Sequence, residues 1–358
     1  MTSTPMLFSP ITLRGLTVPH RLWVAPMCQY SAVDGLVQPW HQVHLGQFAI
    51  GQAGLIITEA TAVEPEGRIS PDDAGLWTTT QRDAWKPIIE FSHSQGVPIA
   101  VQLAHAGRKA STRSPFRPGP PAVAATEGGW ETKAPSALPY GRLPAPHELS
   151  SDEVHDLLAA FGVSARLAVE AGFDAIELHA AHGYLLHEFL SPLSNQRTDE
   201  YGGNVENRLR VVLETTETIR SNMPESMPLF VRISATDWVE GGWDLEQSLA
   251  LSAALENRGV DLIDVSSGGL SPDQEIALGP GYQMPFAEAI SRQVSSMAVG
   301  TVGLITEAQQ AEEALVSGVA DVVLMARQFL REPFYALRAA AELGYDLEWP
   351  GQYLRAKV

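Results

Sequence analysis

The sequence predicts a (β/α)₈ barrel, and three observations support this fold class. Eight short apolar runs, each closed by polar residues or glycine, have the pattern of strands buried on both faces of a parallel sheet. Segments with helical periodicity separate most of these runs. The chain has 358 residues, and a barrel needs only about 250 residues, so extensions around it are expected. An open, doubly wound sheet is the structural alternative.

The eight expected strands cover residues 22–26, 54–58, 98–103, 175–178, 229–233, 262–265, 297–302 and 322–325. The clearest helix lies between the third and fourth of them. Its apolar residues recur every three or four positions between residues 151 and 171, at Val154, Leu157, Leu158, Phe161 and Ala165. The preceding sequence Ser150-Ser151-Asp152-Glu153 has the capping pattern of a helix start.

Three segments lie outside the expected barrel unit: an N-terminal hairpin around residues 8–19, a Pro- and Gly-rich segment at 107–147, and a tail at 344–358. The second follows the third strand, so in a barrel it would overhang the mouth at the carboxyl ends of the strands. Loops of this length are usually lids or binding loops, and Phe116, Trp130 and Tyr140 give this one side chains to pack. No domain boundary is evident, so residues 1–358 are expected to form a single domain with a capping loop.

Composition and charge limit the partners and the chemistry. The chain is 45% hydrophobic and 18% charged, as expected for a globular protein, and its net charge of -18 argues against nucleic acid or an anionic membrane as the main partner. Neither a secretory leader nor a membrane-spanning apolar run is evident, so a soluble, cytoplasmic protein is expected. The single cysteine, Cys28, rules out an internal disulfide, a thiolate zinc site and an iron–sulfur cluster. Redox chemistry would therefore need a bound organic cofactor.

The fourth expected strand ends in three side chains that suit acid catalysis and hydrogen bonding, His179, His182 and Tyr184. Neutral imidazoles can donate hydrogen bonds to a carbonyl oxygen, and a phenol can deliver a proton. Alternatives remain open at this stage. The histidines could bind zinc together with the nearby His187 and Glu188, or they could simply be packed in the core, and Tyr184 could be a packing residue.

Six segments carry a resemblance to the Old Yellow Enzyme family of FMN-dependent ene-reductases, and within it to the branch of xenobiotic reductases and thermophilic-like enzymes. They are APMCQYS at 25–31, TEATAV at 58–63, QLAHAGR at 102–108, HAAHGYLLHEFLSPLSNQRTDEYGGNVENR at 179–208, VRIS at 231–234 and LMARQFLREP at 324–333. The fourth is long and highly specific to the family. Their order along the eight expected strands covers nearly the whole chain and implies a single FMN-binding TIM barrel.

The resemblance implies a ping-pong oxidoreductase in which NADPH or NADH reduces a tightly but non-covalently bound FMN. The reduced flavin then transfers hydride to the activated C=C bond of an α,β-unsaturated carbonyl or nitro compound. It implies that Tyr184 is the proton donor and that His179 and His182 bind the substrate oxygen, where negative charge develops. Tyr30 is similar to a residue that contacts substrate, although packing is its alternative role. Cys28 matches a cysteine that tunes the flavin potential, whereas a lone cysteine is most often an inert buried residue.

The flavin contacts follow from the same resemblance. Gln102 would meet the pyrimidine edge of the flavin, and Arg232 its N1/O2 side. A cation inside a barrel is costly without an anion, and a salt bridge from Arg232 to Glu177 or Glu59 would satisfy it equally well. Backbone contacts would come from Pro26, Met27, Cys28 and Ala60. Barrels commonly bind phosphate after strands seven and eight, where this chain has Gly303, Ala326 and Arg327. Ala326 replaces the usual glycine of the family, and Ala25 replaces a serine found in many relatives.

The tail from Gln352 to Arg355 resembles one that reaches the active site of a neighbouring subunit. It implies a homodimer or homotetramer in which Arg355 acts in trans, whereas a frayed terminus is the alternative. No GxGxxG fingerprint is apparent, which fits a nicotinamide that enters the same pocket as the substrate. The iron–sulfur relatives of this family are excluded by the single cysteine. A flavin-binding sensor or scaffold without efficient turnover, and a flavin-free sugar-phosphate barrel, are the remaining alternatives.

Overall fold

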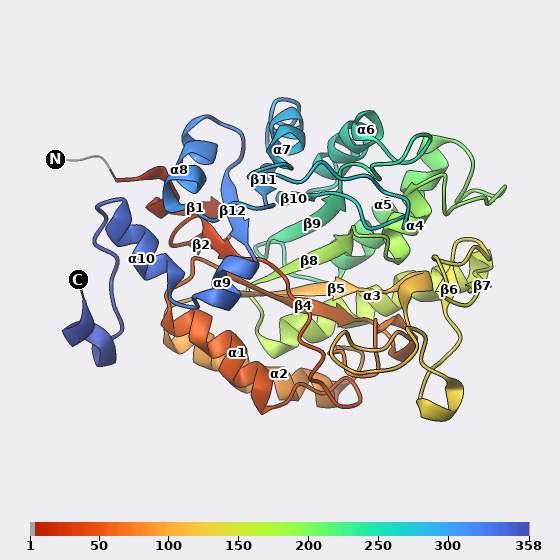
Figure 1. Ribbon diagram of the computed structural model, residues 1–358, viewed down its shortest axis with the longest axis horizontal. Coiled ribbons are helices and arrows are strands. Elements are labelled where there is room, and N and C mark those ends of the chain that lie inside the picture. Colours follow the sequence, from red (N-terminus) through yellow and green to blue (C-terminus); the bar gives the residue numbers. More distant parts are fainter. Residues whose placement is uncertain (1–3, 358) are drawn as a thin grey trace.

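The computed structural model describes residues 4–357, and its centre is a closed barrel of eight parallel strands (Figure 1). This confirms the predicted fold class, and the open sheet is wrong. Around the barrel the strand order is β10-β11-β12-β3-β4-β5-β8-β9. The strands are β3 (Leu22–Val24), β4 (Ile56–Ala62), β5 (Ile99–Ala104), β8 (Ala175–Ala180), β9 (Leu229–Ser234), β10 (Leu262–Ser266), β11 (Ala298–Thr301) and β12 (Val322–Met325).

Each expected run overlaps one of these strands, and the boundaries differ by a few residues. The largest difference is in β4, which continues past Thr58 to Ala62 with Glu59 buried inside it. The strand was expected to end before Glu59 because each apolar run was taken to close at polar residues or glycine. The pairing of β4 with β5 also shifts register between Ile57 and Ala60, as happens at a β-bulge, which re-aims side chains locally.

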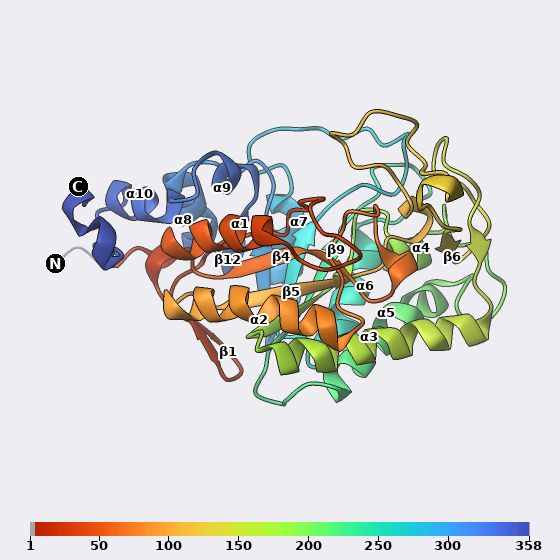
Figure 2. The same ribbon diagram turned by 90° about the horizontal axis from the view of Figure 1, so that it is seen from below.

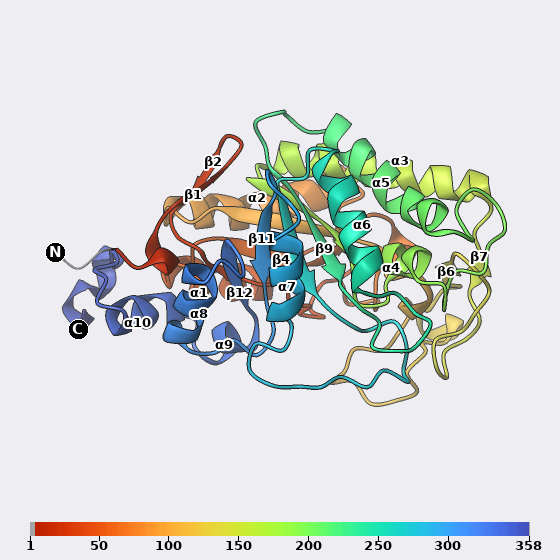
Figure 3. The same cartoon turned by 90° about the horizontal axis from the view of Figure 1, so that it is seen from above.

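Helices cover the outside of the barrel. Figure 2 shows α1, α2 and α3 along one side, and Figure 3 shows α5, α6 and α7 along another. The longer helices are α1 (Pro39–Ile50), α2 (Thr79–Ser94), α3 (Ser151–Ala171), α5 (Val205–Ser221), α6 (Leu245–Glu256), α7 (Met284–Ser291), α8 (Ala308–Val316) and α10 (Tyr335–Glu342). Two short helices, α4 (Leu185–Leu190) and α9 (Arg327–Arg331), follow directly after β8 and β12. Because both faces of every strand are covered, the strands are almost fully buried and mostly apolar.

The helix predicted most clearly, α3, has the expected bounds and start. Ser150 Oγ accepts a hydrogen bond from the Glu153 backbone N–H at 3.3 Å, and the Glu153 carboxylate accepts one from the Ser150 N–H at 2.7 Å. These reciprocal bonds form a capping box, which satisfies two amides that the helix itself leaves unpaired. The helix ends at Gly172, whose φ of 100° lies in the left-handed region that glycine adopts easily.

The predicted N-terminal hairpin is also present, as β1 (Ile11–Leu13) and β2 (Leu16–Val18). Its residues Leu13 and Val18 pack in the same buried cluster as Trp23 and Phe230 from the barrel interior. At the hairpin tip, Arg14 Nε lies 2.6 Å from Asp261 Oδ1, just before β10 begins. The hairpin therefore closes the amino-terminal end of the barrel and leaves the carboxyl end for a site.

The segment 107–147 lies over the carboxyl end of the barrel beside α4, far from the C-terminus (Figure 1). It contains two single turns, η3 (Gly107–Lys109) and η4 (Ala125–Glu127), and β6 (Lys133–Ala134), which pairs with β7 (His147–Glu148). It is tied to the loop after β4: Trp130 Nε1 donates to the Glu66 carbonyl at 2.8 Å, and Lys133 Nζ lies 2.6 Å from Glu64. These contacts hold it as a packed lid.

Two features concern the ends and surface of the molecule. The tail forms the turn η5 (Gly351–Ala356) against α10, on the side of the molecule away from the lid (Figure 1). Within residues 4–357, no helix combines the length and the apolar character needed to span a bilayer.

Candidate active site at the carboxyl ends of the strands

The tip of β8 brings together the three side chains that the sequence placed there. The rings of His179 and His182 lie 5.2 Å apart, and those of His179 and Tyr184 lie 5.3 Å apart. A tight turn makes this possible, with φ of 59° at His182 and 69° at Gly183. A Cβ on Gly183 would lie 2.2 Å from the Gly269 carbonyl oxygen, so the close approach of the two loops requires glycine there.

Burial sets the protonation states of this group. It lowers the pKa of His179 and His182 well below the usual 6.5, helped by the nearby Arg232 charge, so both imidazoles are neutral at physiological pH. Burial raises the pKa of Tyr184 well above 10, so its phenol keeps its proton. His179 Nδ1 has no hydrogen-bond partner among residues 4–357, while His182 Nε2 lies 2.8 Å from Ser266 Oγ. The group therefore combines a weak acid with uncharged hydrogen-bonding rings.

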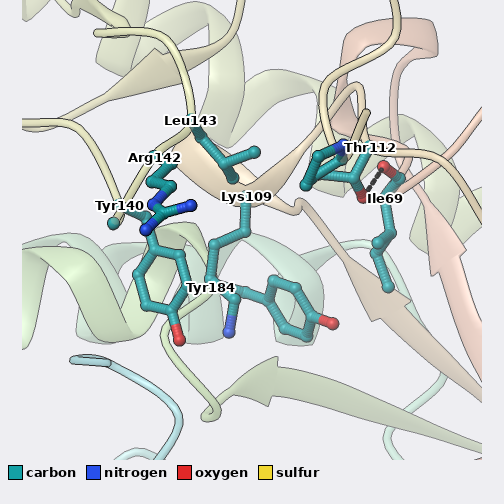
Figure 4. A pocket seen from close by; sticks show the side chains of 9 residues that line it. Ile69, Lys109, Thr112, Tyr140, Arg142, Leu143 and Tyr184 are labelled. Atoms are coloured by element: carbon teal, nitrogen blue, oxygen red, sulfur yellow. Dashed lines mark hydrogen bonds between the residues drawn. The ribbon is translucent and has the colours of Figure 1, made fainter. Parts of the chain in front are cut away.

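Lys109 is a site residue that the sequence analysis missed. Its Nζ donates to the carbonyls of His182 at 2.7 Å and Gly269 at 2.9 Å, and it lies over the rings of Tyr184 and Tyr140 (Figure 4). Burial lowers the pKa of Lys109 to about 8. Its place directly after the QLAHAGR motif, at the end of the third barrel strand, was the signal that could have identified it.

A cavity of about 320 Å³ opens beside this group. Its lining combines Tyr184 with side chains of the lid and of the loop after β4: Ile69, Lys109, Thr112, Pro121, Tyr140, Gly141, Arg142 and Leu143 (Figure 4). Most of these residues lie in the segment 107–147. The structure thus places the predicted lid over the barrel mouth, where it forms one wall of a largely apolar cavity.

The segment after β3 adds Cys28 and Tyr30 to the same side of the mouth. Both pack against Ala60 in an apolar cluster that also includes Tyr184. Burial, reinforced by the nearby carboxyl groups of Asp73 and Glu59, raises the pKa of Cys28 well above 9, so the thiol stays protonated. Pro26 and Met27 precede Cys28 in this segment, and the Met27 carbonyl accepts a hydrogen bond from Gln29 Nε2 at 2.8 Å.

Arg232 inside the barrel has an ion-pair partner that the sequence analysis did not name. Its Nε lies 3.2 Å from Asp264 Oδ2 on the adjacent strand β10, so the salt bridge to Glu177 or Glu59 that was left open as an alternative is not formed. Gln102 Nε2 donates to Glu177 Oε1 at 2.8 Å, and Glu59 pairs with His41 instead.

Two buried carboxyl groups therefore share the field of one guanidinium. Burial, with the Asp264 charge, raises the pKa of Glu177 to about 8 against the opposing effect of Arg232. Burial also raises the pKa of Asp264, again opposed by Arg232. Glu177 Oε2 and both Asp264 oxygens have no hydrogen-bond partner among the described residues. This end of the site can therefore meet a ligand that offers hydrogen-bond donors as well as acceptors, as the pyrimidine ring of a flavin does.

The residues predicted to bind phosphate line one small cavity of about 110 Å³. Gly303 has a φ of 123°, and a Cβ there would lie 2.7 Å from Gln283 Nε2. This position therefore requires glycine, and no side chain covers the backbone there. Arg327 is exposed and makes no hydrogen bond or ion pair within residues 4–357. Arg331, which the sequence analysis did not select, lines the same cavity four residues later. A bare backbone and two arginines suit a phosphate group.

Neither the zinc site that was left open as an alternative nor a contact of Arg355 with the site is formed within one described chain. No cluster of three or more His, Cys, Asp or Glu residues with metal-binding geometry occurs among residues 4–357, and the candidate zinc ligands turn elsewhere. His187 Nε2 lies 2.9 Å from Asp237 Oδ1, and Glu188 Oε1 accepts from the Arg108 N–H at 2.9 Å. Arg355 lies in the exposed turn η5, away from the lid cavity of its own chain.

The structure is a closed (β/α)₈ barrel whose titratable side chains gather at the carboxyl ends of the strands, which is where TIM-barrel enzymes have their active sites. The family described as NADH:flavin oxidoreductase / NADH oxidase matches residues 6–346. The chain is 48% identical over 364 residues to an NADH:flavin oxidoreductase of Gibberella zeae, covering 97% of this chain and 88% of that protein. It is 45% identical over 353 residues to an NADPH dehydrogenase of Geobacillus sp., covering 98% of each.

Solved structures agree with these relatives. An Old Yellow Enzyme homologue from Zymomonas mobilis superimposes with a TM-score of 0.78 at 28% identity, covering 96% of this chain and 94% of that one. The chain therefore belongs to the NADH:flavin oxidoreductase / NADH oxidase family, the family of Old Yellow Enzyme. It is a flavin oxidoreductase that uses NAD(P)H, which confirms the resemblance and excludes a flavin-free sugar-phosphate barrel.

Proposed function

We propose that this protein is an FMN-dependent ene-reductase that reduces the activated C=C bond of α,β-unsaturated carbonyl or nitro compounds. The observation that carries the proposal is the convergence of Tyr184, His179 and His182, whose rings lie 5.2 and 5.3 Å apart beside the lid cavity. A protonated phenol next to two neutral imidazoles is the set that protonation of one carbon and polarisation of one oxygen require. The lid supplies an apolar wall that excludes water from this reaction.

Each side chain then has a defined task. His179 and His182 donate hydrogen bonds to the substrate oxygen, on which negative charge develops. Tyr184 delivers a proton to the α-carbon, and the Lys109 ammonium stabilises the phenolate that remains because it lies 4.9 Å from the ring centre. Tyr30 would contact the substrate from the segment after β3. Bound FMN supplies the hydride for the β-carbon, after it has taken one from NADPH or NADH.

The residues present fit FMN at both ends of the molecule. Gln102 and Arg232 would face the pyrimidine ring, with Asp264, the ion-pair partner of Arg232, beside them. Gly303, Ala326 and Arg327 would hold the phosphate in the small cavity after β11 and β12. Cys28 would lie at the reactive edge, and the backbones of Pro26, Met27 and Ala60 would complete the contacts. We infer that the nicotinamide donor enters the lid cavity itself, since the sequence has no dinucleotide fingerprint.

We also propose that the protein acts as a homodimer or homotetramer, with Arg355 completing the site of a neighbouring subunit. Tyr353 and Leu354, which directly precede Arg355 in the tail, are 43% and 54% exposed, so they are available to a second chain. Deleting residues 352–358 is expected to weaken both assembly and substrate affinity, as measured by sedimentation and by the KM for the alkene. A truncated protein with unchanged assembly and activity would show that the tail has no such role.

An anaerobic titration tests the reaction. NADPH is expected to bleach the oxidised flavin absorbance, and 2-cyclohexenone to restore it. The Tyr184→Phe variant is the matched control: it is expected to bleach normally and to recover about a hundredfold more slowly, because general acid catalysis contributes about 10²–10⁴-fold. Bleaching without recovery in the unmodified protein would reject the enone as acceptor. Absence of bleaching would favour a flavin-binding sensor or scaffold.

A further inference from the structure

Two buried histidine–carboxylate contacts lie directly behind the reactive side chains. The first, the His187–Asp237 pair, has His187 Nε2 at 2.9 Å from Asp237 Oδ1, with both side chains fully buried. The second, the His41–Glu59 pair, has His41 Nε2 at 3.0 Å from Glu59 Oε1, with both side chains almost fully buried. Neither pair lines the lid cavity, so neither touches a substrate there.

Each pair accepts a hydrogen bond from the backbone amide of a residue that lies between two reactive residues in the sequence. The Gly183 N–H donates to His187 Nδ1 at 2.9 Å, and Gly183 lies between His182 and Tyr184 in the sequence. The Gln29 N–H donates to Glu59 Oε2 at 3.0 Å, and Gln29 lies between Cys28 and Tyr30. A buried histidine–carboxylate pair thus meets the backbone of a reactive segment twice, after β8 and after β3; the acceptor is His187 in the first pair and Glu59 in the second.

We propose that the His187–Asp237 and His41–Glu59 pairs are positioning residues, which hold the two segments that carry the reactive side chains. The inference rests on the proposed function, because it takes Tyr184, the two histidines and Cys28 as the reactive groups. It adds a physical reason for the geometry of these segments, which is not set by local preference alone.

Both segments need external support because their backbones are strained. His182 has a φ of 59° and Tyr30 a φ of 50°, and residues other than glycine lose about 1 kcal/mol or more in this left-handed region. Such conformations persist only where the surroundings determine them. The buried amide bonds to His187 and Glu59 provide that support, since a buried N–H without a partner costs about 1–3 kcal/mol.

The bonding also selects one state of each histidine. Because the Gly183 N–H points at Nδ1 of His187, that nitrogen carries no proton, and the proton lies on Nε2 toward Asp237. His41 is arranged in the same way, since its Nδ1 accepts from the Gln38 N–H at 2.9 Å. Asp237 is held in turn by Ser191 Oγ at 2.6 Å and by the Trp243 N–H at 2.8 Å. The pair is therefore a fixed element of the turn and not a proton carrier.

Two amide replacements of His187 separate its two contacts. In His187→Asn the side-chain oxygen can still accept from Gly183, whereas in His187→Gln the side-chain nitrogen can still donate to Asp237 but the acceptor for Gly183 is lost. Hydrogen exchange of the flavin-loaded protein is expected to be about tenfold faster at residues 181–186 in His187→Gln than in the unmodified protein, as the loss of one buried hydrogen bond implies. His187→Asn is expected to stay within about threefold.

Cys28 reports on the second pair, because it is the single cysteine of the chain. In Glu59→Leu the Gln29 N–H loses its acceptor, and alkylation of Cys28 by iodoacetamide is expected to be about tenfold faster than in Glu59→Gln, which removes the same charge beside the thiol but keeps an oxygen that can accept from Gln29. The two pairs should act separately: Glu59→Leu should leave exchange at 181–186 unchanged, and His187→Gln should leave alkylation unchanged. Thr216→Val, which removes a buried hydroxyl bonded within α5, controls for general destabilisation and should change neither readout.

Turnover completes the test. The kcat for enone reduction is expected to fall about tenfold to a hundredfold in His187→Gln with flavin content unchanged, since misplacement by about 1 Å can cost this much, and His187→Asn should restore most of it. Equal rates of exchange at 181–186 in His187→Gln and His187→Asn would overturn the inference. So would a change in both exchange at 181–186 and alkylation of Cys28 in each of His187→Gln and Glu59→Leu. If exchange at 181–186 and alkylation of Cys28 change independently, as expected, but turnover does not change, the two pairs do hold their segments, and the proposed roles of Tyr184 and His182 are refuted. Should His187→Gln fail to fold, Asp237→Asn tests the other contact of the pair: it keeps Nδ1 of His187 as the acceptor for Gly183, and unchanged exchange at 181–186 with unchanged turnover would overturn a positioning role for the carboxylate.

Discussion

The ammonium nitrogen of Lys109 lies 4.9 Å from the centre of the Tyr184 ring. The same nitrogen donates to the His182 carbonyl at 2.7 Å, so it is fixed between the first turn of the lid and the tip of β8. A cation over a phenol ring favours the phenolate form. Lys109 therefore connects closure of the lid with the acid strength of Tyr184.

Lys109 should give the reaction a pH dependence. Burial lowers its pKa to about 8, so the cation disappears as the pH rises through that value. The rate of enone reduction by the reduced protein is expected to fall over this range, measured by stopped-flow absorbance. The Lys109→Met variant should be about tenfold slower below pH 8 and should lack this limb, because the general acid has lost its support. The same limb in Lys109→Met would assign it to another group.

The same shift makes a prediction for stability. Between pH 8 and the ordinary lysine value of 10.5, the unfolded chain holds a proton on Lys109 that the folded chain has released. Stability rises with pH wherever the unfolded state binds more protons. The free energy of unfolding of the unmodified protein, relative to Lys109→Met, should therefore increase from pH 8 to pH 10 in urea titrations. A constant difference would contradict the lowered pKa.

Arg327 should act on the phosphate of the cofactor alone. In the Arg327→Gln variant, the Kd for FMN is expected to rise about tenfold to a hundredfold, since a charged hydrogen bond is worth about 1.5–3 kcal/mol. Riboflavin, which lacks the phosphate, should bind the variant and the unmodified protein equally well in fluorescence titrations. Equal weakening for both flavins would place Arg327 outside the phosphate site.

Replacement of Cys28 should shift the flavin potential without releasing the flavin. Because the thiol stays protonated, it can act as a hydrogen-bond donor that favours the electron-rich reduced flavin. The midpoint potential of Cys28→Ala is expected to be lower by on the order of 10–30 mV, the equivalent of one hydrogen bond for a two-electron couple. Spectroelectrochemistry measures the shift, and the flavin content should be unchanged. An unchanged potential would indicate that Cys28 is only a packing residue.

Glu188 should lower the stability of the fold at alkaline pH. Burial raises its pKa to about 8 against the effect of Arg108, compared with the usual 4.5. The folded state therefore binds more protons than the unfolded state between these values, and stability is lost as the pH rises through this window. Glu188→Gln cannot ionise, so its stability relative to the unmodified protein should grow by on the order of 2 kcal/mol from pH 5 to pH 8 in urea titrations. A difference independent of pH would show that Glu188 does not titrate in this range.

Several parts of the site could be predicted from the sequence because they depend on local order along the chain. Each barrel strand is an apolar run, since both of its faces are covered, and its carboxyl end lies at the mouth. His179, His182 and Tyr184 therefore had to lie near the mouth once the run at 175–178 was identified as a strand. Gly303 and Arg327 follow strands in the same way and do line one cavity.

The pairing of charges was not predictable by the same reasoning. For Arg232 the alternative to a flavin contact was a salt bridge to Glu177 or Glu59, yet the residue contacts Asp264 because the parallel register places the two side by side on β9 and β10. Glu59 was in turn unavailable, because α1 brings His41 against it. Lys109 became a site residue only through the fold of the lid, which directs its side chain toward Tyr184.

The sequence by itself thus determined the barrel, the family and the ends of the strands at which chemistry can occur, because apolar periodicity and motif order are properties of the linear chain. The tertiary structure alone decided which charges neutralise one another and which backbone amides hold the reactive segments. Those choices depend on register and on distances of a few ångströms between residues far apart in sequence, such as Gln29 with Glu59 and Lys109 with His182. Electrostatic and hydrogen-bond energies change steeply over such distances.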